Sequence, residues 1–571
     1  MIVLGVGTIF HDPAACILVD GKLVAAVEEE RLIREKHATG KCPVRAVHFC
    51  LKQAGLKPSD IQEVAFPWDP AVYDKYKWSY FFRNWRSRPS QAYKAIVKCA
   101  GRKRSDYETP RQVLREAGFD LGKIRIHHIQ HHIAHGASAF YFSGFPEAAV
   151  LSIDGAGEFP ATMLGVTEKG RIRILKEICF PDSLGFFYST LTEYLGFERM
   201  DGEYKLMGMA PYGDPARFNF EDIIRYKGGS YRVNDDYIWV PRVSRYRKGV
   251  WFSKKMVKRF GPPRTGDGLS EPYIHIAAVT QQKLEEISIR LLEDYLADAL
   301  KRCGGRLCFS GGCALNVKLN QRLIAHPLVK ELWVQPASSD AGGCLGAAAV
   351  VAHEAGDRIE PMRHVYYGPE YSDSEIARVF QATPHRLVKE ASITERVSEL
   401  LAKGEIVAWF QGRMEWGPRA LGNRSILSNP TVRGMADRIN EIIKFRERWR
   451  PFCPSLLYEK AFEVLDTTHD SPFMTFSFQV RKEWKDRIPE VVHVDGSVRP
   501  QFVKQEQNPR YYELLQRFYK KTGVPILMNT SLNRRGEPMV CAPEDALKMF
   551  EGSALKYLAI GDYLVTKQGC F

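Results

Sequence analysis

Two stretches of the chain follow one pattern, and this pattern decides the expected fold. Residues 2–31 read IVLGVGTIFHDPAACILVDGKLVAAVEEER, and residues 149–178 read AVLSIDGAGEFPATMLGVTEKGRIRILKEI. In each stretch, β-forming apolar residues flank a glycine turn, DG or EKG, which is typical of a β-hairpin. Aligning Pro13 with Pro160 brings the turn glycines together, with two extra residues in the second turn. The pattern indicates a duplication; two unrelated hairpins are the alternative.

A duplicated hairpin predicts an α/β fold whose N-terminal part is a duplicated, actin/sugar-kinase-like domain with a cleft between its lobes. The loops that carry Asp12 and Asp154 would face this cleft. Apolar residues recur at helical spacing over 276–300, which predicts a long helix there. The composition shifts over 357–367. We therefore expect a first domain over 1–356, a linker over 357–367 and a second α/β domain over 368–571.

The composition is that of an ordinary globular protein, with 45% hydrophobic and 26% charged residues. No apolar run approaches the roughly 18–20 residues of a membrane helix, and the first residues lack the basic segment of a signal peptide. Twelve cysteines occur without any CxxC pair. This pattern indicates reduced thiols, so we expect a cytoplasmic protein with no membrane partner.

The net charge of +14 is compatible with a nucleic-acid partner or with small polyanionic substrates. Between the two copies, residues 67–104 mix aromatic residues with lysine and arginine. Such a stretch can form a nucleic-acid surface, because bases stack on aromatic rings beside cations. It can also cover a substrate pocket or form a helical subdomain with an aromatic core. The last two interpretations together are favoured, and recognition of an acceptor substrate is our hypothesis for this insertion.

Five histidines lie within the stretch HHIQHHIAHGASAF, residues 127–140. In a helix, residues four apart share a face, so His131 and His135 can bind one metal ion. His127 would fall on the same stripe, and His128 and His132 would form another. The spacing alone does not choose the ligands, and a helix that simply contains histidines is the alternative.

Two aspartates each follow a predicted strand, Asp154 in SIDGAG and Asp340 in SSDAGG. Two histidines and two carboxylates would suit iron(II), manganese or another borderline divalent ion. The stretch FSGGCALN adds Gly311 and Gly312, whose backbone N–H groups can approach a phosphate closely. A bare glycine turn is the alternative for this pair.

The C-terminal part concentrates cations in FQGRMEWGPRALGNRS and KFRERWRPFCPS. Its arginines alternate with tryptophan, glycine and proline, residues that build pockets. Arginine binds phosphate through two parallel hydrogen bonds, which favours a small phosphorylated ligand over a merely solvated face. The stretch MNTSLNRRGEP adds an amide-rich loop after an apolar strand. The cations of this region are Arg413, Arg419, Arg424, Lys444, Arg446, Arg448 and Arg450.

Seven motifs occur in order along essentially the whole chain: HHIAHGASAF, SLGFFYSTLTEYLGFERMDGEYKLMGMAPYG, SGGCALN, SSDAGG, GRMEWGPRALGNRSI, KFRERWRPFCPS and NTSLNRRGEP. Together they resemble the NodU/CmcH family of O-carbamoyltransferases. The resemblance implies an N-terminal domain like the tRNA threonylcarbamoyl transferase and a C-terminal domain like the YrdC fold. It also implies that the C-terminal domain forms carbamoyl adenylate from carbamoyl phosphate and ATP. The N-terminal domain would then transfer the carbamoyl group to an acceptor hydroxyl.

The resemblance also implies roles for individual residues. Iron(II) is the implied metal, and Mg²⁺ would accompany ATP. His11 would deprotonate the acceptor, with a loop histidine of structural role as the alternative, and Lys36 would contact the acceptor or phosphate. The implied metal ligands are His131, His135, Asp154 and Asp340. The implied nucleotide-binding residues are Lys205, Gly311, Gly312 and Asn316. The implied carbamoyl phosphate and ATP pocket comprises Arg419, Arg424, Lys444, Arg450, Arg499 and Asn529.

The implied partners are ATP, carbamoyl phosphate and a small-molecule hydroxyl acceptor such as a sugar or another natural product. Nucleic acid is not expected as a partner, and a homodimer stays open. Two other functions compete with this interpretation. One is a tRNA-modifying enzyme of the threonylcarbamoyl class, and the other is a non-enzymatic nucleic-acid-binding protein that uses the basic, aromatic insertion.

Overall fold

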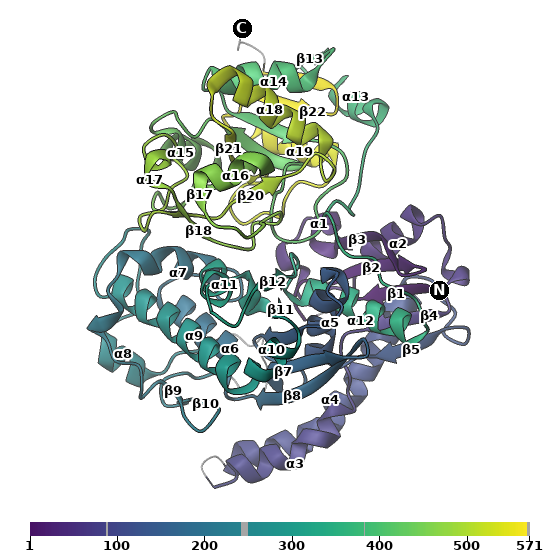
Figure 1. Cartoon of the computed structure of the whole chain (residues 1–571). Coiled ribbons are helices and arrows are strands. Elements are labelled where there is room, and N and C mark those ends of the chain that lie inside the picture. The colour runs from purple at the N-terminus through teal and green to yellow at the C-terminus, as the bar shows by residue number, and fades with distance from the viewer. Residues whose placement is uncertain (9, 87–88, 241–248, 382, 568–571) are drawn as a thin grey trace. The chain divides into compact units, whose positions relative to one another are not determined.

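The computed structural model describes residues 1–8, 10–86, 89–240, 249–381 and 383–567 (Figure 1). Residues 87–88 of the aromatic insertion lie outside this description. Contacts divide the chain into two compact units. The first unit comprises Met1–Ala25 and Thr39–Met362, and the second comprises Ala26–Ala38 and Arg363–Phe571. The sequence-based domain boundaries did not anticipate that the short segment Ala26–Ala38 groups with the C-terminal part.

The first unit contains two five-stranded sheets built on one plan. Their orders are β3-β2-β1-β4-β5 and β8-β7-β6-β11-β12. In each sheet three antiparallel strands are followed by two parallel ones. The predicted α/β class and the predicted duplication are therefore confirmed. The strands are β1 (Ile2–Val6), β2 (Ala14–Val19), β3 (Lys22–Glu28), β4 (Glu63–Phe66), β5 (Arg125–His128), β6 (Ala149–Ile153), β7 (Pro160–Glu168), β8 (Arg171–Cys179), β11 (Arg306–Ser310) and β12 (Glu331–Val334).

The two copies also agree in their turns. Gly21 and Gly170 end the tight turns at φ 78° and 77°, and the residue before each also has a positive φ, as a two-residue hairpin turn requires. The N–H of Gly7 donates to Ala14, and the N–H of Asp154 donates to Ala161. These bonds make Gly7 the counterpart of Asp154, as the alignment of Pro13 with Pro160 implies.

Two long helices lie between the sheets and carry much of the later site. Helix α5 (His131–Ser143) follows β5, and helix α12 (Asp340–Glu354) follows β12. A Cβ at Gly136 of α5 would meet side chains of β6, β7 and β8, whereas a Cβ at Gly5 of β1 would meet the α12 backbone. Each helix thus packs on a different sheet.

The two helices approach each other most closely at Gly346 of α12. A Cβ there would lie 1.8 Å from the carbonyl oxygen of Ala134 in α5. We expect Gly346→Ala to force the helices apart, at a cost of about 1–3 kcal/mol in unfolding free energy. The matched control is Gly356→Ala, whose Cβ would meet no heavy atom within 4 Å of it, although its φ of 98° adds local strain.

Chemical denaturation measures the stability of both variants, and elemental analysis measures their metal content. Gly346→Ala should lose both stability and metal, because α5 and α12 each supply candidate ligands. Equal losses in the two variants would contradict a role for the helix contact.

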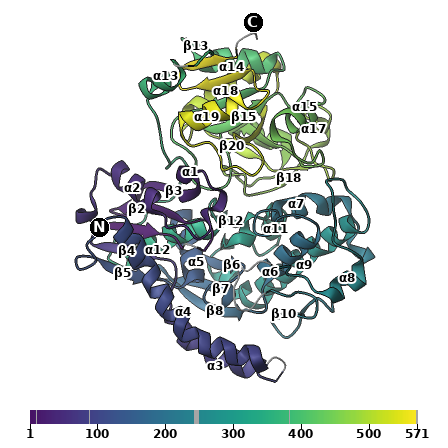
Figure 2. The ribbon, with the colours of Figure 1, turned by 180° about the vertical axis from the view of Figure 1, so that it is seen from behind.

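The remaining helices of the first unit include the predicted helix over 276–300, which is found as α9 and α10. A hairpin of two further helices, α3 and α4, extends away from the sheets (Figures 1 and 2). Within the described residues, no helix combines the length and the apolar character needed to cross a bilayer. These helices are α2 (Val44–Gln53), α3 (Val72–Asn84), α4 (Pro89–Glu116), α6 (Leu184–Tyr194), α7 (Glu203–Met209), α8 (Lys254–Phe260), α9 (Tyr273–Tyr295), α10 (Ala297–Arg302) and α11 (Val317–Ile324).

The second unit is built on a mixed eight-stranded sheet in the order β13-β23-β22-β14-β15-β21-β16-β20. Its strands are β13 (Arg386–Lys389), β14 (Val407–Phe410), β15 (Arg424–Ser428), β16 (Cys453–Leu457), β20 (Gln501–Val503), β21 (Ile526–Ser531), β22 (Tyr557–Ile560) and β23 (Tyr563–Thr566). Its main helices are α13 (Asp373–Gln381), α14 (Ile393–Ala402), α15 (Met435–Ile439), α16 (Tyr458–Val464), α18 (Pro509–Thr522) and α19 (Pro543–Glu551). The short helix α1 (Glu29–Ile33) belongs to this unit as well.

Candidate functional site

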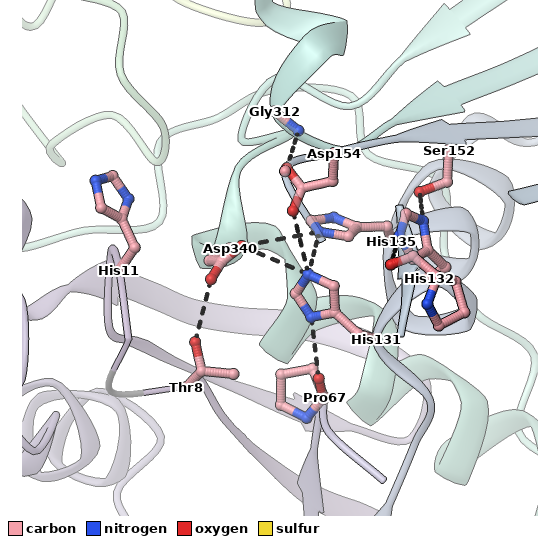
Figure 3. Close-up of polar contacts among 12 residues, drawn as sticks. Thr8, His11, Pro67, His131, His132, His135, Ser152, Asp154, Gly312 and Asp340 are labelled. Carbon is pink, nitrogen blue, oxygen red and sulfur yellow. Dashed lines mark hydrogen bonds and ion pairs between the residues drawn. The ribbon is translucent and has the colours of Figure 1, made fainter. Parts of the chain in front are cut away.

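Four side chains of the first unit gather at one point with their polar atoms facing each other (Figure 3). One ligand atom from each of His131, His135, Asp154 and Asp340 can be chosen so that all lie within 4.8 Å of one another. The two Nε2 atoms of the histidines are 3.0 Å apart. His131 Nε2 lies 3.5 Å from Asp154 and 3.6 Å from Asp340. This donor set of two imidazoles and two carboxylates suits a borderline divalent cation.

The duplicated fold explains why these four residues meet. His131 and His135 occupy the first and fifth positions of α5, so both imidazoles lie on one face of that helix. Asp340 is the first residue of α12, the corresponding helix of the second sheet, and Asp154 follows β6. Residues far apart in sequence therefore converge where the ends of the two sheets and their helices meet.

Neighbouring groups orient three of the four candidate ligands. The Gly312 N–H donates to Asp154 Oδ1 at 2.9 Å, and the Thr8 hydroxyl donates to Asp340 Oδ2 at 3.3 Å. His131 Nδ1 lies 3.3 Å from the carbonyl oxygen of Pro67, which leaves Nε2 facing the carboxylates. Sequence reasoning missed Thr8. Thr8 directly follows Gly7, the residue that corresponds to Asp154 in the duplicated plan. This position could have indicated it from the sequence.

Replacing Thr8 by valine tests this orienting bond. Valine keeps the shape of threonine but removes the hydroxyl that holds Asp340, so we expect metal affinity to fall about 10- to 100-fold. Thr8→Ser keeps the hydroxyl and should retain most of the affinity. Competition with a metal-binding dye measures both variants. Equal affinity of Thr8→Val and the wild type would show that the bond does not position Asp340.

The electrostatics of the four residues favour a cation. Burial lowers the pKa of His131, but the bond to Asp154 and the charge of Asp340 outweigh it and raise the pKa to about 9. Burial opposes ionisation of Asp154, yet its bond to His131 and the surrounding histidines hold its pKa well below the usual range. Burial, together with the charge of His131, lowers the pKa of His135. Burial raises the pKa of Asp340 to about 6. A cation that binds here therefore displaces a proton from His131.

The other three histidines of the stretch have different partners. His132 is buried, and its two ring nitrogens lie 2.8 Å from the Ser152 hydroxyl and 3.0 Å from the Pro160 carbonyl. His127 and His128 belong to strand β5, so the interpretation of the whole stretch as one helix was wrong. The helix begins only at His131, because the preceding residues pair with β4.

A buried glutamate next to the four residues was also missed by sequence reasoning. Glu158 lies in the loop between β6 and β7 and accepts hydrogen bonds from the backbone N–H groups of His131 and Asp69. Burial raises its pKa to about 7, although the charge of His131 opposes this rise. Glu158 therefore secures the first turn of α5, on which both histidines depend.

His11 lies on the loop after β1, on the Asp340 side of this cluster (Figure 3). Its Nδ1 is 3.1 Å from Asp12 Oδ2, and both side chains are largely buried. The charge of His11 also lowers the pKa of Asp340, which indicates that the two groups are close. The structure thus brings His11 to the edge of the candidate metal site.

The predicted nucleotide residues do not all present free groups. Gly311 has a φ of 91°, and its Cβ would lie 2.4 Å from the carbonyl oxygen of Ile153, so glycine is required at this turn. The N–H of Gly312 is engaged by Asp154. Asn316 caps α11 by accepting from the Leu319 N–H, and it also bonds Gln281. Lys205 lies over the ring of Phe197 at 5.4 Å.

In the second unit, the ammonium of Lys444 is buried among oxygen atoms at the end of β21. It donates to the carbonyl and side-chain oxygens of Ser531 and Asn533 over 2.5–3.2 Å. Burial lowers the pKa of Lys444 well below the usual range, and the charges of nearby cations lower it further. The nearby cations are Arg446, Arg450 and Lys36. We call these four residues the cationic cluster; one of its members, Arg450, pairs with the buried carboxylate of Glu447 at 3.3 Å.

The loop between β14 and β15 carries Arg419 and is held from two sides. Glu415 Oε1 accepts N–H bonds of 2.7–3.1 Å from Leu421, Asn423 and Arg424. The N–H of Gly417 donates to Glu28 at 2.9 Å, and its carbonyl accepts from Arg31 at 3.1 Å. The segment Ala26–Ala38 thus supports this loop, while the side chain of Arg419 stays half-buried.

Arg424 has a structural role that differs from its expected place in a phosphate pocket. Its guanidinium is fully buried, lies 3.6 Å from the centre of the Phe410 ring and donates to the carbonyls of Gln411, Gly412 and Pro369. It therefore ties backbone segments together, and we leave it out of the proposed pocket.

Two other predicted pocket residues lie beside strand β16. Asn529 is buried and donates to the Ala420 carbonyl and the Ser455 hydroxyl. Arg499 directs Nε and Nη2 at the sulfur of Cys453, at 3.0 and 2.8 Å. Because Cys453 pairs with Asn529 across the strands, these groups lie close together.

Comparison with known proteins gives matches over both parts of the chain. The family model described as carbamoyltransferase N-terminus matches residues 2–349, and that described as carbamoyltransferase C-terminus matches residues 398–567. An uncharacterized protein of Synechocystis sp. is 35% identical over 99% of this chain and 96% of its own length. The nodulation protein NolNO of Sinorhizobium fredii is 37% identical over 98% of this chain and 80% of its own length. The nodulation protein NolO of Bradyrhizobium diazoefficiens is 38% identical over 77% of this chain and 79% of its own length.

Proposed function

Because the chain belongs to the carbamoyltransferase family, we propose that it is an ATP-dependent O-carbamoyltransferase that uses carbamoyl phosphate as donor. Transfer of a carbamoyl group from a donor to an acceptor follows from family membership. The choice of ATP, carbamoyl phosphate and a hydroxyl acceptor is our proposal. The gathering of basic side chains at the end of β21 in the second unit, with Lys444 fixed on Ser531 and Asn533, is the observation that supports it.

We assign the activation of the donor to the second unit. Carbamoyl phosphate is hydrolysed to carbamate and inorganic phosphate, and the carbamate oxygen then attacks the α-phosphorus of ATP. Carbamoyl adenylate forms and pyrophosphate leaves. Mg²⁺ would accompany the ATP phosphates and offset their negative charge. Arg419, Arg450 and Arg499 bind the phosphates, because guanidinium groups pair with phosphate oxygens through two hydrogen bonds. Lys444 supports this site by holding Ser531 and Asn533 in place.

We assign the transfer step to the first unit. The acceptor oxygen attacks the carbonyl carbon of carbamoyl adenylate, the C–O bond to AMP breaks, and AMP leaves with the electron pair. His11 takes the proton of the acceptor hydroxyl, since a neutral imidazole suits this task near neutral pH. Lys36, which belongs to the cationic cluster, contacts phosphate rather than the acceptor.

The metal centre belongs to the transfer step in this proposal. His131, His135, Asp154 and Asp340 would hold iron(II), and the ion would supply positive charge near the adenylate phosphate. Lys205 lies on α7 and Asn316 caps α11 of the same unit, and we propose that they border the nucleotide there. Gly311 and Gly312 serve mainly by shaping the turn that orients Asp154.

An acceptor-free reaction tests the proposal. Purified protein is incubated with carbamoyl phosphate, ATP and Mg²⁺, and mass spectrometry follows carbamoyl adenylate while an enzymatic assay follows pyrophosphate. We expect both products, and neither when carbamoyl phosphate is omitted. Formation of neither product under anaerobic, iron-supplied conditions would remove the first step and with it this choice of donor.

A further inference from the structure

The α3–α4 hairpin concentrates the positive charge of the protein. Residues 75–105 contain ten lysines and arginines and no aspartate or glutamate, in a chain whose net charge is +14. Asp74, directly before this stretch, is paired with Lys77 and Lys103, and its bonds to these lysines lower its pKa to about 2. Glu177 of β8 lies 3.5 Å from Lys75. Most of the excess charge of the chain therefore lies on one projecting element.

The same hairpin exposes large hydrophobic side chains. Trp78 and Phe82 of α3 and Trp85, which caps its C-terminus, recur at helical spacing along one stripe and are 52%, 67% and 45% exposed. On α4, Tyr93 and Val97 are 66% and 56% exposed. These five are the majority of the nine large hydrophobic side chains that are exposed among the described residues. Single exposed hydrophobics are ordinary, but such a concentration marks an interaction surface.

The core of the hairpin does not need these five residues. Tyr80 of α3 and Cys99 of α4 are buried together with Tyr73, in a cluster completed by Phe159. Asn84 and Ala92 are buried as well. The exposed stripe of α3 lies on the side of the helix opposite Tyr80, because residues two apart in a helix point in nearly opposite directions.

The base of the hairpin is fixed in the first unit beside the candidate metal centre. Asp106 of α4 accepts from the Tyr73 hydroxyl at 2.6 Å and from the indole N–H of Trp68 at 3.0 Å. The Trp68 ring in turn packs against His131, with ring centres 5.3 Å apart. From Asp106 to Val97 the helix rises by about 14 Å, so the exposed residues lie away from this anchored base.

The charged and aromatic side chains exposed on the hairpin favour one kind of binding partner over two others. A second copy of the hairpin would bring two strongly positive surfaces together, and they would repel. Single-stranded nucleic acid binds in charged grooves whose aromatic side chains stack with bases, whereas these rings lie along the outer stripe of a helix. Aromatic and aliphatic side chains beside lysine and arginine match the boundary between acyl chains and anionic headgroups of a bilayer.

We propose that the α3–α4 hairpin docks the protein on an anionic lipid surface. Trp78, Phe82 and Trp85 enter the headgroup region, and the surrounding cations bind the negative lipids. The protein lies on the membrane without crossing it, which revises the expectation of no membrane partner. This inference does not depend on the proposed chemistry of either unit.

Vesicle co-sedimentation of the full chain tests the proposal. We compare vesicles of phosphatidylcholine alone with vesicles that also contain phosphatidylglycerol, at low and high salt. The wild type should bind the anionic vesicles and be released by salt. The triple variant Trp78→Ser/Phe82→Ser/Trp85→Ser should bind at least about tenfold more weakly. The matched control is Trp239→Ser, at a tryptophan that is 53% exposed outside the hairpin, and it should bind as the wild type does.

A second variant separates charge from folding. Arg86→Glu/Arg104→Glu changes two exposed hairpin residues, keeps the aromatic stripe and should also weaken binding to anionic vesicles. Circular dichroism and metal content of both variants should match the wild type. Equal binding to both kinds of vesicle, or unchanged binding of both variants, would overturn the proposal. So would binding of single-stranded RNA, or a change of oligomeric state, that depends on these residues when no vesicle binding is seen.

Discussion

We expect His135→Ala to lose the metal ion and the transfer of the carbamoyl group but still to form carbamoyl adenylate. The imidazole of His135 is fully buried and its Nε2 lies 3.0 Å from that of His131, so alanine removes one of the four candidate ligands. We expect metal content to fall from about one ion per chain to less than about a tenth, because three ligands remain in a site that holds four. Transfer should fall at least about 100-fold.

The same histidine stretch offers the matched control for this experiment. His127 lies on β5 and its Nε2 is 2.5 Å from Glu63 Oε2, away from the four candidate ligands. His127→Gln should keep the metal and the activity. Elemental analysis measures the metal, and mass spectrometry measures adenylate and carbamoylated product separately. Loss of adenylate in His135→Ala would show that the metal also serves donor activation, and our separation of the two steps would be wrong.

Arg419→Ala has the opposite expected effect. Its guanidinium is half-buried in a loop that Glu415, Glu28 and Arg31 hold through hydrogen bonds to other residues. The loop should therefore keep its conformation when the side chain is removed. Carbamoyl adenylate formation should fall at least about 100-fold, because a guanidinium that binds phosphate in the transition state contributes at this scale. Metal content should not change.

Arg433→Ala is the control for the loss of one positive charge. Arg433 is exposed in the same unit, after β15, and plays no part in the proposed pocket. Its variant should form adenylate at the wild-type rate. Exchange of labelled pyrophosphate into ATP, in the presence of carbamoyl phosphate, measures both variants. A fall of equal size in Arg433→Ala would indicate a general effect of charge, and Arg419 would then have no specific role.

Much of the fold could be predicted because it depends on local patterns. Apolar β-forming residues on either side of glycine turns indicated both hairpins. The shared pattern of the two stretches indicated the duplication. These features follow from the steric limits of each turn and from periodic burial along each strand. The spacing of His131 and His135 could be recognised for the same reason, but the residue at which the helix begins could not. Pairing of β5 with β4 holds His127 and His128 in a strand, and that pairing depends on residues far away in the chain.

The sequence by itself determined the α/β class, the duplicated plan and the residue types available for a metal and for phosphate. Only the tertiary structure decided which of these residues meet. Thr8, Glu158 and Gly312 were found to support the candidate metal centre. Arg424 was found to be buried, with its guanidinium bonded to backbone carbonyls. The physical reason is that side-chain periodicity depends only on residues close together in sequence. A site forms where strands and helices that are far apart in sequence pack together.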